Sequence, residues 1–371
     1  MTLDREFFEE MPKAELHLHL DGALKPKDIW ALAQKHRVTL PNLPEQTQDA
    51  LQRYYQLPKG VNLSDPEAFN RFLGMFKVAL SVMQTRTSLR DAALAHVMDL
   101  HSRNYVYAET RFAPQYHTEG GMSLEMAIQS VIEGLQLGYE RTRKETLVKP
   151  IVCIGREANQ ETSLAVAKAA LAFEQDGVVA LDLACNETLY PPELHKPAFE
   201  LTFKSPLART VHAGEFAKTP EQRVQNVRTA LNDLKADGLG HAIPLPGQAD
   251  LLAHVKRAAI RVESCPLSNK ITRAINGDLR ELALDVLLKE GVLVTVNTDD
   301  PAIFGTSLAD VLQAVCRAYG FGKEEVRKLM RNAVESAFCD HDEEMRAYFA
   351  FKHKGLHLLS DEPDNPFNQL G

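Results

Sequence analysis

Short runs of apolar, often β-branched residues recur along the chain, and each ends in a cluster of polar or charged residues. Their nearly continuous apolar character is typical of strands that are buried on both faces of a parallel sheet. Stretches with helical spacing separate the runs, so strands and helices are expected to alternate. The eight runs span residues 14–21, 106–114, 147–156, 178–187, 208–215, 238–245, 261–269 and 292–301.

The segments between and after these runs carry helical signals. Residues 165–177 are rich in alanine and finish on Gly177, a residue type that is common just past a helix C-terminus. After the eighth run, Ser307 and Asp310 resemble a capping box, which predicts a helix start. Apolar positions then recur at helical spacing in two stripes, formed first by Leu308, Val311, Leu312 and Val315, then by Val326, Leu329, Met330, Ala333, Val334 and Ala337.

Eight strands alternating with helices predict an α/β fold of the (β/α)8 TIM-type barrel class, with extra C-terminal helices. The competing architecture is a doubly wound open sheet, which usually carries a GxGxxG loop after its first strand. Residues 21–26 read DGALKP and do not match that loop. The 371 residues would allow two or three domains, but one barrel can accommodate them, so a single domain over residues 1–371 is expected.

Residues 22–105 interrupt the alternation after the first strand. Insertions at this place in a barrel lie on the catalytic face, so this mostly helical segment is expected to form a lid. Within it, one helical face gathers four apolar residues, Phe69, Phe72, Leu73 and Phe76. Such a face serves equally well as core packing or as an apolar rim over a substrate, and the pattern does not separate the two.

Composition narrows the class of partner. The chain has 42 Lys+Arg against 50 Asp+Glu and a net charge of −8, without a run of basic residues, which argues against nucleic-acid and membrane partners. The five cysteines are dispersed and form no CxxC pair. They favour a reducing, cytoplasmic location, and the acidic N-terminus does not resemble a signal peptide.

Candidate chemistry lies where the predicted strands end. The first strand ends in His17, His19 and Asp21, the fifth in His212 and Glu215, the sixth carries His241, and the eighth ends in Asp299 and Asp300. In a barrel these points meet at one mouth. Three histidines and one carboxylate suit a catalytic zinc, and Glu215 follows closely enough to act as a general acid or base.

Each motif is weak by itself, because an HxH in an apolar run or an aspartate pair before proline often has a structural role. Their conjunction is harder to explain in that way, since charged and polar side chains rarely collect in a buried place without a function. We therefore interpret the four strand ends as one metal-dependent active site.

The segments PKAELHLHLDGA, HAGE, GLGHA, SCPLSN and NTDDPAIFGTSL resemble the signatures of the adenosine deaminase family, from residue 12 to about residue 340. The resemblance implies hydrolytic deamination at a purine C6 with one zinc ion per protomer. It implies zinc ligands at His17, His19, His212 and Asp299, and Glu215 as the acid that protonates N1.

The same resemblance assigns the remaining positions. His241 would orient the nucleophile and steady the tetrahedral adduct, and Asp300 would hold purine N7. Asp21 would bind the ribose, with His19 beside the substrate. The backbone N–H of Cys185 would reach purine N3. The partner implied is a small purine nucleoside, and the oligomeric state stays open.

Two departures bear on the substrate. Family members typically read DLAGDE after the fourth strand, whereas this chain has DLACNE, so Cys185 replaces a glycine and Asn186 an acid. Arg273 and Ala274 also depart from the usual pattern after the seventh strand. Adenosine and 2′-deoxyadenosine are the expected substrates. Adenine or a modified 6-aminopurine, a different barrel hydrolase, and a non-catalytic ligand-binding relative are the alternatives.

Overall fold

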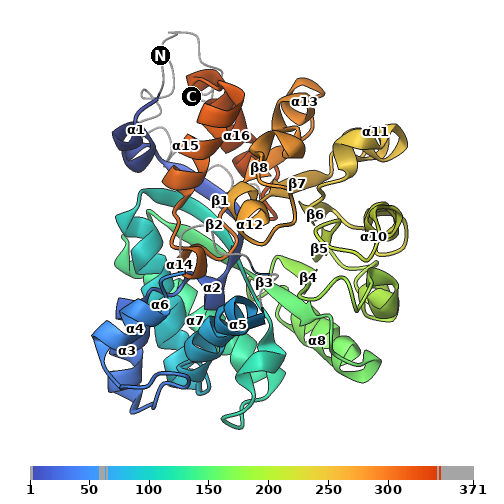
Figure 1. Ribbon diagram of the computed structural model, residues 1–371. Helices are drawn as coiled ribbons and strands as arrows, with labels where there is room; N and C mark the ends of the chain where they lie inside the picture. Colours follow the sequence, from blue (N-terminus) through green and yellow to red (C-terminus); the bar gives the residue numbers. More distant parts are fainter. Residues whose placement is uncertain (1–2, 58–62, 64–65, 341, 344–371) are drawn as a thin grey trace.

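The computed structural model describes residues 3–57, 63, 66–340 and 342–343, and within this part the eight predicted runs each contain a strand. All pair in parallel, in the order β1 to β8 (Figure 1). Between β8 and β1, Leu18 bridges Asp299, which closes the ring at its carboxyl end. The strands are β1 (Lys13–His19), β2 (Tyr105–Phe112), β3 (Leu147–Gly155), β4 (Ala180–Ala184), β5 (Ala208–Ala213), β6 (Gly238–His241), β7 (Arg261–Ser264) and β8 (Val294–Val296).

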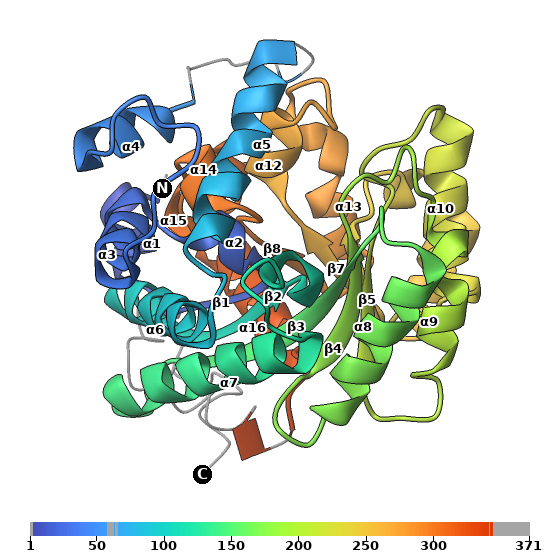
Figure 2. The same ribbon diagram turned by 90° about the horizontal axis from the view of Figure 1, so that it is seen from below.

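Helices surround this barrel (Figure 2), as the alternating pattern predicts. The fold is thus a (β/α)8 barrel of the TIM type. The helices from α7 onward are α7 (Leu124–Arg141), α8 (Gln160–Ala172), α9 (Lys196–Glu200), α10 (Pro220–Asn232), α11 (Ala249–Arg257), α12 (Pro266–Ile271), α13 (Leu284–Lys289), α14 (Pro301–Phe304), α15 (Leu308–Tyr319) and α16 (Lys323–Glu335). Short 3₁₀ turns lie at Pro114–His117, Pro192–His195, Leu245–Gly247 and Leu279–Leu282.

The two predicted C-terminal helices are present as α15 and α16. The side chain of Ser307 caps α15 through the backbone N–H of Asp310, and Asp310 reciprocates, as the sequence predicts. On α16, the side chain of Asn332 donates to the carbonyl of Val294 at the start of β8, so α16 lies against the amino ends of the strands. The extra C-terminal residues 341 and 344–371 lie outside the described part of the chain.

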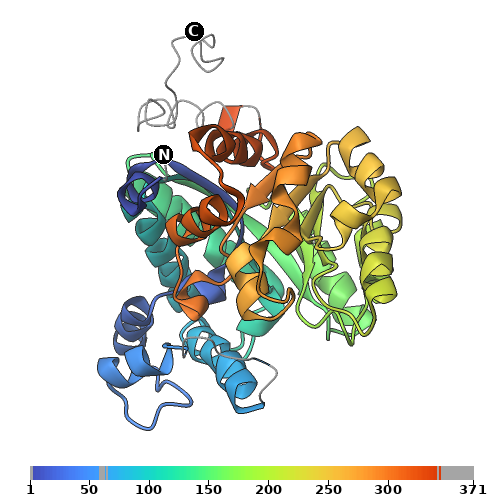
Figure 3. The ribbon, with the colours of Figure 1, turned by 45° about the horizontal axis from the view of Figure 1, so that its top comes forward.

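The first strand is preceded by α1 (Arg5–Glu10). The described residues of the segment after it form five helices, α2 (Leu20–Ala23), α3 (Pro26–His36), α4 (Gln48–Tyr54), α5 (Pro66–Ser81) and α6 (Arg86–Ser102). Helix α6 lies along α7 and belongs to the outer ring of the barrel. Helix α5 instead contacts α2 and α14, the two short helices that follow β1 and β8. Figure 3 shows the insertion (blue) and α16 at opposite ends of the molecule.

The apolar face of α5 divides between core and surface. Phe72 and Phe76 are half-buried and contact each other edge to face, with ring centroids 5.3 Å apart. Phe72 also stacks on Phe304 of α14 at 5.9 Å, whereas Leu73 remains 42% exposed. The side chain of Phe69 lies outside the described part. The face therefore anchors α5 over the end of the barrel.

Two further sequence expectations concern the environment of the protein. All five cysteines are free, as expected for a chain without a disulfide framework. Among the described residues, no helix combines the length and apolar character needed to cross a bilayer.

Candidate active site

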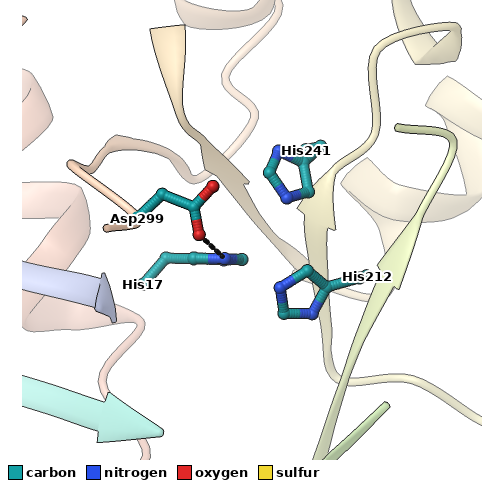
Figure 4. Close-up of side chains that lie close together, drawn as sticks. All are labelled: His17, His212, His241 and Asp299. Carbon is teal, nitrogen blue, oxygen red and sulfur yellow. Dashed lines mark ion pairs between the residues drawn. The ribbon is translucent and has the colours of Figure 1, made fainter. Parts of the chain in front are cut away.

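Side chains from four strand ends meet at the carboxyl end of the barrel (Figure 4). Nitrogen or oxygen atoms of His17, His212, His241 and Asp299 all lie within 4.8 Å of one another, and all four residues are buried. The predicted ligand set contained His19 in place of His241. His19 lies at the same place, because its Nε2 atom is 3.2 Å from both Asp299 Oδ1 and His212 Nε2.

Buried carboxylates behind the cluster orient two of the imidazoles. Nδ1 of His17 is 2.8 Å from Glu263 Oε2, and Nδ1 of His212 is 3.2 Å from Asp182 Oδ1. The guanidinium of Arg111 bridges the two acids, at 2.8 Å from Glu263 and 3.1 Å from Asp182. A carboxylate that accepts from Nδ1 fixes the imidazole in the tautomer whose Nε2 carries a free lone pair.

The charge states agree with this arrangement. Burial alone would raise the pKa of Glu263 and of Asp182, but the neighbouring cations and histidines outweigh it and hold both values well below the usual range. Arg111 is the first of these for Glu263, and His212 is the first for Asp182. Burial lowers the pKa of His212 to about 4. The acids are therefore ionised and His212 is neutral at pH 7, the state that a metal ligand needs.

The free nitrogens of the cluster lack partners that would satisfy them. Nε2 of His17 is buried and has no hydrogen-bond partner among the described residues. Nε2 of His212 lies 3.2 Å from Nε2 of His19, which is itself 3.2 Å from Asp299 Oδ1. Imidazole nitrogens gathered around a carboxylate oxygen in this way form a donor set of the kind that a transition-metal ion prefers.

Glu215 follows β5 and points toward His241. The turn that carries it contains Gly214 at φ 76°, a left-handed backbone conformation that glycine adopts without strain. Burial raises the pKa of Glu215 well above its ordinary value, and the charges of Asp299 and Glu187 raise it further. Its Oε2 atom lies 3.4 Å from His241 Nε2.

His241 is kept neutral and held in one orientation. Burial lowers its pKa well below the usual range. Its Nδ1 accepts a hydrogen bond from Nδ2 of Asn269 at 2.9 Å, which leaves the proton on Nε2, on the side of Glu215. The site thus places an acid of raised pKa beside an imidazole N–H donor.

The two adjacent aspartates, which follow the end of β8, differ in their pKa values. Burial opposes ionisation of Asp299, but the imidazoles of His17 and His19, whose Nε2 atoms lie 3.3 and 3.2 Å from its Oδ1, hold its pKa well below the usual range. The hydroxyl of Ser268 also donates to it at 2.7 Å. By contrast, burial raises the pKa of Asp300 well above the usual range, and the charges of Asp299 and Asp21 add to this.

Asp21 and Cys185 lie at the rim of the same mouth. Asp21 is on α2 and forms no hydrogen bond or ion pair within the described residues. Cys185 follows β4 at φ 80°, so it has the left-handed backbone that its glycine counterpart would adopt. Its exposed Sγ is 3.4 Å from the hydroxyl of Tyr116, which hydrogen-bonds to Glu157.

Sequence reasoning missed the residues that support this site. Arg111, Asp182 and Glu263 lie inside predicted strands. A charged residue within an otherwise apolar run was the only sign in the sequence that could have indicated their role. Asn269 and Ser268 lie in the SCPLSN segment. This segment resembles a family signature, but the resemblance assigned no role to either residue.

The fold and the site define a class: barrel enzymes that hold a metal ion among histidines and an acid at the carboxyl ends of their strands. Comparison with known proteins narrows this class of enzymes to one family. The family model for adenosine deaminase matches residues 12–348. The adenosine deaminase of Clostridium kluyveri is 30% identical over 338 residues, covering 91% of this chain and 92% of its own. The chain therefore belongs to the adenosine deaminase family and is a deaminase-type hydrolase.

Solved structures show the same fold. An adenine deaminase from Arthrobacter aurescens matches with a TM-score of 0.77 at 26% identity, covering 92% of this chain and 98% of its own. The N6-methyl-AMP deaminase of Arabidopsis thaliana matches with a TM-score of 0.78 at 24% identity, covering 95% of this chain and 100% of its own.

Proposed function

We propose that the chain catalyses zinc-dependent hydrolytic deamination of adenosine and 2′-deoxyadenosine, which yields inosine or 2′-deoxyinosine and ammonia. The pair formed by Glu215 and His241 carries the proposal. An acid kept protonated by burial lies 3.4 Å from a neutral imidazole, and the metal-type cluster lies alongside. Deamination of an aminopurine needs such an acid, because protonation of N1 makes C6 electrophilic.

One zinc ion per protomer would be held by His17, His19, His212 and Asp299. Imidazoles with free Nε2 lone pairs and one ionised carboxylate fit zinc. Zinc supplies a hydroxide nucleophile at neutral pH, because it lowers the pKa of a coordinated water to roughly 7. Elemental analysis of protein purified without chelator should give a stoichiometry near one. A value near two, or full retention in the His17→Ala and His212→Ala double variant, would contradict the proposed site.

The protein groups divide the remaining work. Glu215 gives its proton to N1 as the nucleophile adds to C6. The Nε2–H of His241, fixed by Asn269, faces the place where charge develops on the attacking oxygen and can stabilise it. Collapse of the tetrahedral adduct then expels ammonia and leaves a 6-oxopurine.

Asp300 and Asp21 would recognise opposite parts of the substrate. Purine N7 is an acceptor, so its partner must bring a proton, and the raised pKa of Asp300 supports a neutral carboxyl that donates. The Oδ1 atom of Asp300 is buried without a partner among the described residues. Asp21, without a partner at the rim, would accept from a ribose hydroxyl, with His19 beside it.

Cys185 and the insertion would complete the pocket. The φ of 80° at Cys185 supports the expectation that its backbone N–H serves purine N3 as the N–H of a glycine would. We propose that α5 acts as the lid. In this view Phe72 and Phe76, with the neighbouring Leu73, form the apolar rim over the purine, and the Phe72–Phe304 stack anchors them.

A substrate panel tests the nucleoside assignment. Adenosine, 2′-deoxyadenosine, adenine and AMP are compared by ultraviolet absorbance, with ammonia release as a check, on wild type and on Asp21→Ala. A charge-assisted hydrogen bond contributes roughly 1.5–3 kcal/mol, so Asp21→Ala should lose about one to two decades of kcat/KM on nucleosides. Its activity on adenine should change little. Asp49→Ala, an exposed acid at the start of α4, is the matched control.

Adenine is the second candidate substrate, because the Arthrobacter aurescens neighbour is an adenine deaminase. If wild type turns over adenine best, adenine replaces adenosine as the assigned substrate. If it turns over AMP best, or none of the four compounds, the adenosine assignment is also wrong and a modified 6-aminopurine becomes the leading candidate. The same panel therefore decides between the two.

A further inference from the structure

The short segment that carries Glu215 is held from one side by a single carboxylate. Both oxygens of Glu187 accept backbone N–H groups, from Gly214 at 2.8 Å, Glu215 at 2.9 Å and Phe216 at 3.0 Å. The amide Nδ2 of Asn226 on α10 donates to the same carboxylate at 2.9 Å. Glu187 is only 3% exposed, so water does not compete for these four bonds.

A guanidinium holds the carbonyl groups of the same segment. Nε of Arg223 donates to the carbonyl of Gly214 at 2.8 Å, and its Nη2 atom donates to the carbonyl of Glu215. Nη2 also donates to the carbonyl of Ala274 at 2.8 Å. One peptide segment is thus clamped between an anion that takes its N–H groups and a cation that takes its carbonyls.

The strand itself cannot supply this order. β5 ends at Ala213, and the left-handed backbone of Gly214 turns the chain out of the sheet, so residues 214–216 have no neighbouring strand to pair with. Glu187 follows β4, while Arg223 and Asn226 come from α10, so two separate elements fix the turn. Bonds to charged groups are stronger than neutral ones, which suits a segment that must hold one position.

We infer that Glu187, with Arg223 opposite it, is a positioning residue that fixes the backbone of Glu215 and so aims its carboxyl at the reacting ring. The inference rests on the proposed function, because it takes Glu215 as the proton donor. Displacement of a catalytic group by about 1 Å can lower a rate by about 100-fold. Glu187 would therefore govern turnover without touching substrate or metal.

Glu187→Gln is the direct test. The side chain keeps its size, but its amide offers one acceptor oxygen and points an NH₂ group at backbone N–H donors. We expect kcat for adenosine to fall by about 10- to 100-fold, with KM and metal content little changed. Asp237→Asn is the matched control, since Asp237 accepts the backbone N–H of Arg209 at the other end of β5.

Amide hydrogen exchange of the metal-loaded protein gives a readout that does not depend on turnover. Peptides containing residues 214–216 should be protected in wild type and in Asp237→Asn, and should exchange much faster in Glu187→Gln. If wild type deaminates nothing, the proposed function fails, and the exchange result still decides whether the clamp exists. Arg223→Lys keeps the positive charge but loses the planar guanidinium that donates to both carbonyls, so it should give the same exchange pattern. It replaces Glu187→Gln as the test if Glu187→Gln does not fold.

Three results would overturn the inference. The first is unchanged kcat in Glu187→Gln. The second is an equal loss in Asp237→Asn, which would reduce the effect to general stability. The third is loss of metal from Glu187→Gln, which would show that Glu187 positions the ligand His212 and not Glu215.

Discussion

Gly22 on α2 should be intolerant of even one methyl group, although it takes no part in the chemistry. A Cβ atom at this position would lie 1.8 Å from Oδ1 of Asp300, 2.6 Å from its Cγ and 2.8 Å from its Cβ. Asp300 is itself buried, so it cannot swing into solvent. Gly22→Ala must therefore displace the carboxyl that we assign to purine N7.

The expected size of the effect follows from these distances. A non-bonded contact needs more than about 3 Å, so Oδ1 of Asp300 must retreat from 1.8 Å by more than about 1 Å. Misplacement of this size can cost about 100-fold in rate. Overpacking adds roughly 1–3 kcal/mol of lost stability. Helix propensity favours alanine by up to about 1 kcal/mol, so local preference cannot be the cause of a loss.

The assay compares kcat/KM for adenosine and for 7-deazaadenosine, in which a C–H group replaces N7. Gly22→Ala should lose about two decades of kcat/KM on adenosine and much less on 7-deazaadenosine. The preference of wild type for adenosine over the deaza compound should therefore largely disappear. Gly247→Ala is the control, because nothing lies within 4 Å of a Cβ at that position. A Gly22→Ala enzyme with near-native activity on adenosine would refute the reasoning.

Three further variants test other parts of the site and fold. Glu215→Gln should keep its metal and its stability but lose about 10²–10⁴-fold in kcat, and near-native turnover would remove Glu215 from its role. Arg111→Met removes the buried cation that Asp182 and Glu263 share, so we expect a loss of roughly 3–5 kcal/mol in urea unfolding and metal binding weakened by about 10–100-fold in a chelator competition. Burial lowers the pKa of His96 to about 4, so the folded state binds fewer protons than the unfolded state. The free energy of unfolding should thus fall as pH drops from about 6.5 to 4, and less steeply in His96→Gln if that histidine is a cause.

The fold could be predicted because strand burial has a simple signature. A strand covered on both faces must be apolar along its whole length, and the first six of the eight positions in the fifth run, residues 208–215, form β5. The ends of helices were harder to predict from the sequence. The helix predicted to finish on Gly177 stops at Ala172, and four residues separate it from the glycine, whose φ of 112° serves the turn instead.

The site could be predicted only in part, for a physical reason. The sequence allowed His17, His212 and Asp299 to be predicted as a cluster, because strand ends converge in a barrel and imidazole is a common metal ligand. The bridge from Asp182 through Arg111 to Glu263 spans β4, β2 and β7, so its members are far apart in sequence. A local pattern cannot reveal that one cation pairs with two distant anions in three dimensions.

Backbone geometry links these observations. Cys185, His241 and Asp299 each stand at or just after a strand end with φ of 80°, 63° and 69°, values that cost a non-glycine residue of order 1 kcal/mol or more. A left-handed residue breaks the alternation of a strand, so the side chain or the N–H that follows can face the mouth. The strain is sustained because neighbours over-determine each position: Asn269 holds the ring of His241, and Ser268 holds the carboxylate of Asp299. Left-handed residues also occur elsewhere in the chain, so strain by itself does not mark a site, but three such residues at converging strand ends agree with the proposed catalytic centre at this mouth.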